Sequence, residues 1–362
     1  MAAPRGRGVS PTGGGPRLAG MLRAELRPPP SPRARRIEET DVLNPRSETP
    51  MRPDATIAAV DAPVVSVVIP HYQQPPDLAR ALASLGAQTG APPFEVIVVD
   101  NGSAKAPEAE CALHPGVRLM LETEKGPGPA RTMGARAARG AILAFLDADC
   151  MADPDWIATL HGLLTGDPSI DVLAGGVRIA PANPSGRMNA IECYEQVFSY
   201  RQKLFVERDR YAATLNMAVR RATFDEVGPF AGLSTAEDRD WGRRAAALGK
   251  RIVYAPQMRI ATPARDSFAE VARKWDRQIG HDYHEARASL KGRILWGVKA
   301  LIMPVSSLAA IPEISAAEGL AGPGARIRAF AVLTRTRLWR ARRMAELACG
   351  LDPAGLAAGW RK

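Results

Sequence analysis

The chain has 362 residues, of which 46% are apolar and 24% charged, a composition typical of a folded protein with a substantial core. Four scattered cysteines without a CxxC pair argue against a zinc ribbon or a disulfide framework and suit a reducing cytoplasm. The net charge is +10, and the excess lies near the C-terminus, where residues 286–362 hold thirteen Lys and Arg against four Asp and Glu.

The first 62 residues are rich in Gly, Pro and Arg and show no lasting apolar period. This composition predicts a disordered tail. The tail also lacks the apolar core of a signal peptide, so we expect a cytoplasmic protein.

The next segments alternate between strand and helix patterns. Strands are expected at Val64–Pro70, Phe94–Asp100, Val117–Leu121, Ala141–Leu146, Asp171–Ile179 and Ile252–Ala255. Helices are expected at Asp77–Leu85, Pro129–Arg139 and Glu237–Leu248. The alternation predicts an α/β fold with a mostly parallel sheet flanked by helices. In such sheets ligands bind beyond the carboxyl ends of the strands.

Carboxylates stand at the ends of two expected strands. Asp100 ends one strand, and Asp147 and Asp149 follow another in the stretch "FLDADC". Because a strand alternates its faces, Asp147 and Asp149 would share a side and repel unless a cation or a proton lies between them. Hydrogen bonding to a loop is one use of such acids. Binding of Mg²⁺ or Mn²⁺ is the other, since these ions prefer carboxylate oxygens and often contact substrate phosphates.

Residues 263–362 differ from the rest of the chain, and we expect a basic helical extension there. Leu295–Ile311 is apolar but is broken by Pro304, and it is shorter than the ~20 residues that cross a bilayer. Arg326–Leu347 alternates Arg with large apolar residues. This pattern suits a helix in a membrane interface or a helix packed on the rest of the protein. Nucleic-acid-binding signatures are missing, so we expect no nucleic-acid partner.

Five motifs in order resemble those of family 2 glycosyltransferases. They read "VSVVIPHYQ", "EVIVVDNGS", "GPGPARTMGARAARGAILAFLDADC", "LNMAVRRATFDEVGPF" and "STAEDRDWGRRAAALGKRIVYAP", and they run from Val64 to Pro256. Members of this family are inverting, metal-dependent enzymes of the GT-A fold that use nucleotide-sugar donors. The resemblance therefore implies a GT-A catalytic domain at 63–262.

The resemblance also implies roles at matched positions. Contacts to the nucleotide-sugar would come from Pro70, Tyr72, Asp100, Arg131, Asp147 and Asn216. Asp100 would accept the N–H of a uracil or thymine, and Arg131 would reach the base or the diphosphate. Asp147 would touch the ribose or the metal, Asp149 would be the principal metal ligand, and Asp238 would be the catalytic base.

Asp238 stands beside Glu237 in the first turn of an expected helix, where the helix dipole favours the ionised form that a base needs. A carboxylate that only stabilises the helix is the alternative. Arg221 matches a segment that borders donor or acceptor.

Two departures from the family pattern affect the site. Thr132 stands where many members have Asn, and no His occurs in Met258–Arg265, where many members have a metal-binding one. Either the metal has fewer protein ligands, or His281 and His284 take that place.

We thus expect transfer of a sugar from a UDP-, TDP- or GDP-linked donor to a hydroxyl of a glycan or a lipid-linked acceptor. Such a reaction belongs to the synthesis of cell-surface polysaccharide, glycolipid or another glycoconjugate. The enzyme would be cytoplasmic, with the basic C-terminus as a candidate contact to the cytoplasmic face of the membrane. Two alternatives are a sugar-nucleotidyltransferase and a non-catalytic membrane-binding protein. The first usually needs a glycine-rich basic loop after the first strand, but residues 71–76 contain neither glycine nor a cation.

Overall fold

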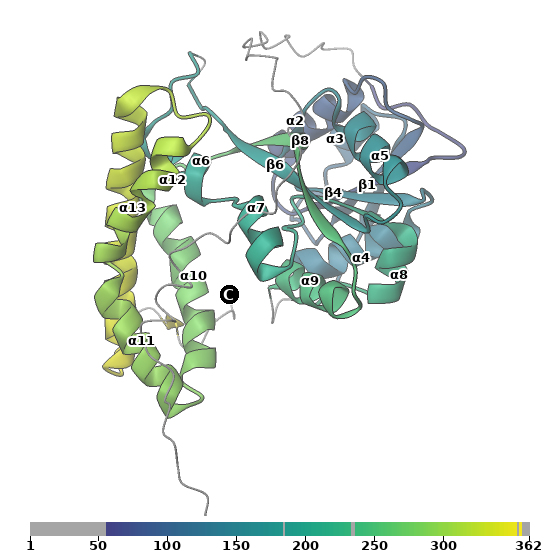
Figure 1. Cartoon of the computed structure of the whole chain (residues 1–362). Helices are drawn as coiled ribbons and strands as arrows, with labels where there is room; N and C mark the ends of the chain where they lie inside the picture. Colours follow the sequence, from purple (N-terminus) through teal and green to yellow (C-terminus); the bar gives the residue numbers. More distant parts are fainter. Residues whose placement is uncertain (1–55, 184, 233–235, 353–354, 357–362) are drawn as a thin grey trace, which may run out of the picture. The chain divides into compact units, whose positions relative to one another are not determined.

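A computed structural model describes residues 56–183, 185–232, 236–352 and 355–356 (Figure 1). For His281 the description is limited to the backbone. Residues 1–55 of the expected disordered tail lie outside the described residues. Residues 233–235, just before the helix that carries Asp238, also lie outside them.

The described residues contain one eight-stranded sheet, with the strands in the order β3-β2-β1-β4-β7-β6-β8-β5. The strands are β1 Val65–His71, β2 Phe94–Asp100, β3 Val117–Leu121, β4 Ile142–Leu146, β5 Met151–Ala152, β6 Val172–Ala180, β7 Asn216–Arg220 and β8 Ile252–Pro263. The neighbours among β3, β2, β1 and β4 are parallel, as are β6 and β8. Strand β7 runs antiparallel to β4 and β6, and β5 runs antiparallel to β8. The expected mostly parallel sheet is therefore confirmed.

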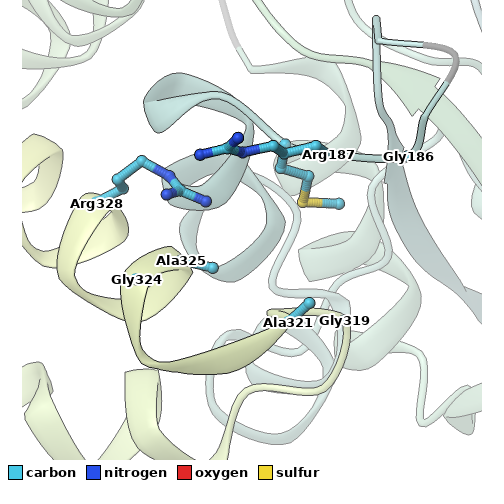
Figure 2. A pocket seen from close by; sticks show the side chains of 8 residues that line it. Gly186, Arg187, Gly319, Ala321, Gly324, Ala325 and Arg328 are labelled. Carbon is cyan, nitrogen blue, oxygen red and sulfur yellow. The ribbon is translucent and has the colours of Figure 1, made fainter.

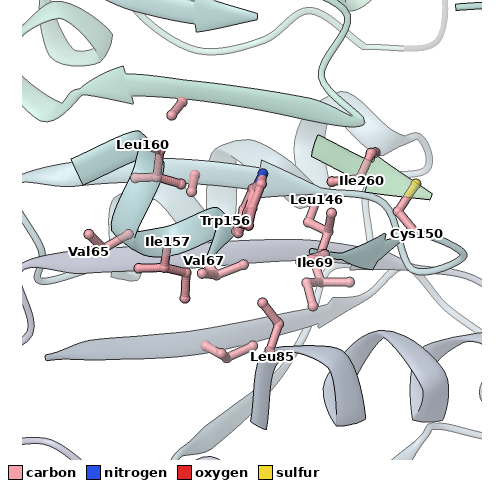
Figure 3. Packing of buried hydrophobic residues seen from close by; sticks show 14 of the residues in the cluster. Val65, Val67, Ile69, Leu85, Leu146, Cys150, Trp156, Ile157, Leu160 and Ile260 are labelled. Carbon is pink, nitrogen blue, oxygen red and sulfur yellow. The ribbon is translucent and has the colours of Figure 1, made fainter. Parts of the chain in front are cut away.

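Helices cover both faces of this sheet (Figure 1). They are α2 Pro75–Gly86, α3 Glu108–Ala112, α4 Pro127–Ala137, α5 Trp156–Gly166, α8 Arg221–Val227 and α9 Glu237–Ala247. Alternate residues of β1 point to opposite faces: Val65 and Val67 pack in the core under α2 and α5, while Val68 packs in the core under α4, α8 and α9. Figure 3 shows the first of these cores, where Trp156 and Ile157 lie over β1.

A separate helical part follows β8 and includes a segment between β6 and β7. Its elements are α6 Ala190–Phe198, α10 Phe268–Ala286, α11 Leu290–Ile302, the 3₁₀ helix η2 Val305–Ala310, α12 Ile311–Ala316 and α13 Gly322–Ala348. The short helix α7 Gln202–Leu204 and the π-helical turn η1 Phe205–Asp209 pack on the sheet instead, where Phe205 lies against the core under α2 and α5. One core joins Tyr194 and Phe198 of α6 to Ala329 and Leu333 of α13. Helix α6 precedes residue 262 in the chain but shares this core with the helices that follow it. The expected domain boundary at residue 262 therefore stays a prediction.

Helix α13 contains the alternating Arg and apolar segment 326–347. Its apolar residues Val332 and Leu333 pack against α6, and Met344 and Leu347 pack against α10 and α11. Of the two interpretations of this segment, packing on the protein is the one that the structure supports. Within the described residues, no single helix is long and apolar enough to cross a membrane. Helix α11 and residues 305–316 are long and apolar enough only when they are taken together, and the two segments are bent by 70° relative to each other between residues 302 and 305.

Candidate active site

A cavity of about 450 Å³ opens beyond the carboxyl ends of β1 and β4, within the size range of small-molecule sites. Five of the predicted site residues line it, namely Pro70, Tyr72, Arg131, Asp147 and Asp149. Pro70 comes from the end of β1, Tyr72, Asp147 and Asp149 from the loops after β1 and β4, and Arg131 from the first turns of α4. The ring of Tyr72 is largely exposed at the cavity rim, where it could stack on a planar base.

Asp100 ends β2 but does not line the cavity, because its carboxylate is buried in a hydrogen-bonded cluster. Its Oδ1 lies 2.8 Å from His71 Nδ1 and accepts from the Ser103 hydroxyl at 2.6 Å, and its Oδ2 accepts from the Ser103 amide at 3.0 Å. The amide of Gln74 donates to His71 Nε2 at 3.2 Å, so the ring hydrogen is on Nδ1 and points to Asp100.

This cluster explains the electrostatics of Asp100. Burial alone would raise the pKa of Asp100, but the hydrogen bonds from Ser103 and His71 outweigh burial and lower it. The carboxylate thus fixes the loops after β1 and β2. In the described conformation neither oxygen of Asp100 lines the cavity that a nucleobase would enter. The expected contact to uracil or thymine therefore stays a prediction.

Lys125, next to Gly126, is a cavity residue that the sequence analysis did not single out. Its loop is held by Asn101, whose Oδ1 accepts from the Gly126 amide at 2.6 Å and whose Nδ2 donates to the Glu124 carbonyl at 2.7 Å. Asn101 lies in the stretch "DNGS", which the sequence predicts to be a turn. The loop that Asn101 contacts could not be predicted, because it lies more than twenty residues further along the chain.

Arg131 connects the cavity to the start of α9. Its side chain is buried and donates from Nη2 to Asp147 Oδ1 at 2.6 Å and from Nη1 to Glu237 Oε1 at 2.9 Å. Burial would lower the pKa of Arg131, but the charges of Asp147 and Glu237 raise it. The guanidinium therefore stays charged and fixes two carboxylates from distant parts of the chain, and Glu237 is a site residue whose partner the sequence did not reveal.

Asp147 and Asp149 both face the cavity after β4. Burial, with the neighbouring charge of Asp147, raises the pKa of Asp149 from 3.8 to about 6. Two neighbouring carboxylates whose charges repel each other are suited to binding a divalent cation, because the cation would remove that repulsion. The described residues contain no group of three or more His, Cys, Asp or Glu that could hold a metal, so the substrate would have to supply further ligands. His284 lies on α10, and the side chain of His281 is outside the description.

Asp238 lies in the first turn of α9, next to the Arg131–Glu237 pair. Burial and the charge of Glu237 raise the pKa of Asp238 from 3.8 to about 6, although its Oδ1 accepts from the Arg239 amide at 2.7 Å. The net effect of the surroundings thus disfavours the ionised form, and the expected contribution of the helix dipole stays a prediction. A pKa near 6 still leaves the group mostly ionised at neutral pH and suits a general base.

The loop before α9 approaches the start of α4 closely. A Cβ at Gly128 would lie 1.9 Å from the Ala231 carbonyl oxygen, so glycine is needed there. The Thr132 hydroxyl accepts from the Phe230 amide at 3.0 Å. Thr132, which departs from the family pattern, thus fixes the loop that leads to Asp238.

Asn216 and Arg221 have structural contacts that differ from the expected ones. Asn216 has no exposed surface: its Nδ2 donates to the carbonyls of Gly176 at 2.9 Å and Met258 at 2.8 Å, and its Oδ1 accepts from Trp156 Nε1 at 2.9 Å. These bonds tie β7 to β6, β8 and α5. The guanidinium of Arg221 donates to the Gly140 carbonyl at 2.8 Å, just before β4 begins and at the opposite end of that strand from Asp147.

Another cavity, of about 270 Å³, lies between the loop before α6 and the start of α13. Figure 2 shows Arg187 and Arg328 on its walls. None of the predicted site residues lines it, so it is not part of the candidate active site.

Comparisons with known proteins agree with this geometry. Residues 66–233 match the family "Glycosyl transferase family 2". Glycosyltransferase AglE of Haloferax volcanii is 30% identical over 219 residues, which cover 59% of this chain and 70% of that relative. The chain belongs to glycosyl transferase family 2. The matched region includes every named residue that lines the cavity of about 450 Å³ and ends just before the helix that carries Asp238.

Two further similarities extend over more of the chain. The pre-mycofactocin glycosyltransferase of Mycobacterium tuberculosis is 28% identical over 306 residues, covering 81% of this chain and 62% of that relative. Among solved structures, mannosyltransferase PcManGT from Pyrobaculum calidifontis, in complex with GDP-Man and Mn²⁺, superimposes with a TM-score of 0.50. It is 19% identical, and the match covers 81% of this chain and 89% of that one. This likeness shows that the fold is of the GT-A type.

Proposed function

We propose that this glycosyltransferase moves a sugar, with inversion, from a nucleoside-diphosphate-sugar to an acceptor hydroxyl. The observation that carries the proposal is a continuous row of charged side chains from the cavity to α9. Asp149 and Asp147 face the cavity, Arg131 links Asp147 to Glu237, and Asp238 follows in the same helix turn. Such a row supplies groups that can bind a diphosphate at one end and a catalytic general base at the other.

The donor would occupy the cavity of about 450 Å³. Tyr72 would stack on its base, and Lys125 would lie near the diphosphate. Asp149 and Asp147 would hold Mn²⁺ or Mg²⁺, which when bound neutralises charge on a diphosphate leaving group. The complex of PcManGT with GDP-Man and Mn²⁺ supports a donor and an ion of this class. UDP-, TDP- and GDP-linked sugars all stay candidates.

In the chemical step, Asp238 accepts the proton of the acceptor hydroxyl. The hydroxyl oxygen forms a bond to the anomeric carbon as the bond from that carbon to the diphosphate oxygen breaks, and the electron pair leaves with the nucleoside diphosphate. Attack from the opposite face inverts the anomeric configuration. Arg131 fixes Glu237 and Asp147, so the position of the base is coupled to the position of the donor-binding acids.

For the acceptor we keep the expectation of a glycan or a lipid-linked molecule, in a cytoplasmic enzyme. A pathway of polysaccharide, glycolipid or other glycoconjugate synthesis would supply it.

A panel of nucleotide-sugars in a thermal-shift assay, with and without Mn²⁺, tests the donor class. We expect one donor to raise the melting temperature only with the ion, and Asp149→Asn to remove that rise. Asp238→Asn should keep the rise but lose turnover by about 10²–10⁴-fold, because general-base catalysis contributes that much. Asp155→Asn is the matched control, since it changes an exposed Asp in the loop after β5. Equal effects of Asp149→Asn and Asp155→Asn would contradict the proposal.

A further inference from the structure

A surface of large apolar side chains lies exposed on the helical part of the protein. We call it the α11–η2 surface; it comprises Leu290, Ile294, Val298, Leu301, Ile302, Val305 and Leu308. The exposed fractions of Leu301 and Leu290 are 81% and 75%, and those of Val305 and Leu308 are 66% and 58%. Monomeric soluble proteins rarely expose large apolar patches, and such patches often mark the site at which a protein binds another protein or a membrane.

The geometry of α11 separates this surface from the face that the protein itself buries. Trp296 and Ala300 are buried against Met344 and Leu347 of α13, and Trp296 Nε1 donates to the Met344 carbonyl at 3.0 Å. At about 100° per residue, Ile294 and Leu301 lie roughly 160° and 140° around the helix from Trp296. The exposed apolar stripe is therefore the face of α11 opposite the core, and no described helix covers it.

Charge in this segment has one sign. Residues 286–312 contain Arg287, Lys291, Arg293 and Lys299 and no Asp or Glu. All four cations are exposed. Their long side chains can extend to a polar layer while the apolar residues between them enter a nonpolar one.

We propose that the α11–η2 surface binds the surface of an anionic lipid bilayer, with α11 lying in the interface. The apolar stripe would enter the boundary between headgroups and acyl chains, and the cations would contact anionic headgroups. Helix α11 has 13 residues, a length of about 20 Å, whereas the hydrocarbon core is about 30 Å thick. The 70° bend before residue 305 also suits a segment that lies on the membrane.

A second copy of the chain fits this surface less well. In a twofold contact the same surface would face itself, which would bring Lys291 and Lys299 of both copies together without an acid between them. Anionic headgroups remove that repulsion. The segment differs from Arg326–Leu347, which the sequence suggested, because α13 buries Val332, Leu333, Met344 and Leu347 in the helical part, whereas the large apolar residues of the α11–η2 surface are exposed.

Co-sedimentation of the full chain with vesicles tests the proposal, and it needs neither donor nor acceptor, so its outcome is independent of the transfer reaction. We expect binding to phosphatidylcholine vesicles that contain phosphatidylglycerol, weaker binding to pure phosphatidylcholine, and a decrease as salt rises. The double variant Leu301→Gln/Val305→Gln should lower the partition coefficient at least about tenfold. Lys291→Gln/Lys299→Gln should lower it about fivefold for each cation removed.

Leu113→Gln is the matched control, because Leu113 is a similarly exposed leucine (68%) beside α3. Its binding should equal that of the wild type, and the melting temperature of each variant shows that it is folded. The proposal is overturned if the wild type does not bind mixed vesicles, or if Leu113→Gln loses as much binding as the double variant. It is also overturned if light scattering shows a dimer that Leu301→Gln/Val305→Gln dissociates while vesicle binding is absent.

Discussion

Replacing Asp238 with Asn should make the protein more stable near neutral pH while it removes turnover. Burial and Glu237 raise the pKa of Asp238 from 3.8 to about 6. At about 1.4 kcal/mol per pKa unit, the folded state disfavours the ionised carboxylate by about 3 kcal/mol. Asn has no charge, and its side-chain oxygen can still accept from the Arg239 amide. We expect the free energy of unfolding to rise by about 1–2 kcal/mol, since some relaxation accompanies the charge in the wild type.

The gain in stability should depend on pH in a defined direction. The pKa of Asp238 in the folded state lies above its ordinary value, so the folded state binds the proton more tightly than the unfolded state does. The unfavourable contribution of the wild-type carboxylate is full above about pH 6, decreases between about pH 6 and pH 4, and is absent below that. The advantage of Asp238→Asn should follow the same course.

Urea unfolding followed by tryptophan fluorescence, at about pH 7.5 and about pH 4, measures this effect, provided that the m-values of wild type and variant agree. Glu237→Gln is the internal control. It breaks the ion pair with buried Arg131 and should therefore lower stability by about 1–3 kcal/mol. The reasoning is refuted if Asp238→Asn is no more stable than the wild type near neutral pH, or if it is stabilised equally near pH 4.

Three further predictions follow from the same contacts. If Asp238 is the base, kcat/KM should fall about tenfold for each pH unit below about 6; a rate that stays constant down to pH 5 would exclude it. Asn216→Leu should lower the free energy of unfolding by about 2–5 kcal/mol, because Trp156 Nε1 and two carbonyls lose their partner; unchanged stability in urea would contradict the structural role. Gly128→Ala should lower turnover and also lower stability by about 1–3 kcal/mol, because the new Cβ would displace the Ala231 carbonyl; Gly162→Ala, with open space around its Cβ, is the control that should lower neither.

The parts of the fold that the sequence predicted well are those with a local signal. Strands β1 to β4 are short segments dominated by apolar residues, and their observed bounds differ from the expected ones by at most one residue. Strand β7 was not predicted, because Asn216–Arg220 mixes polar and apolar residues and gains its partners β4 and β6 only in the folded sheet. Strand β8 was predicted only to Ala255. It continues to Pro263 because β6, after a register shift between Gly175 and Gly176, and β5 pair with its second half.

The sequence by itself determined the family, the parallel strands β1 to β4 and the acids at their carboxyl ends, because these depend on motifs and apolar periods within short stretches of chain. Only the tertiary structure decided the environments of those acids. Asp100 is enclosed by His71 and Ser103, and Asp238 is buried beside Glu237. Contacts of this kind join residues that are distant in sequence, and burial depends on everything packed around a group. Neither the direction of a pKa shift nor the apolar face that α11 leaves exposed can therefore be read from local pattern.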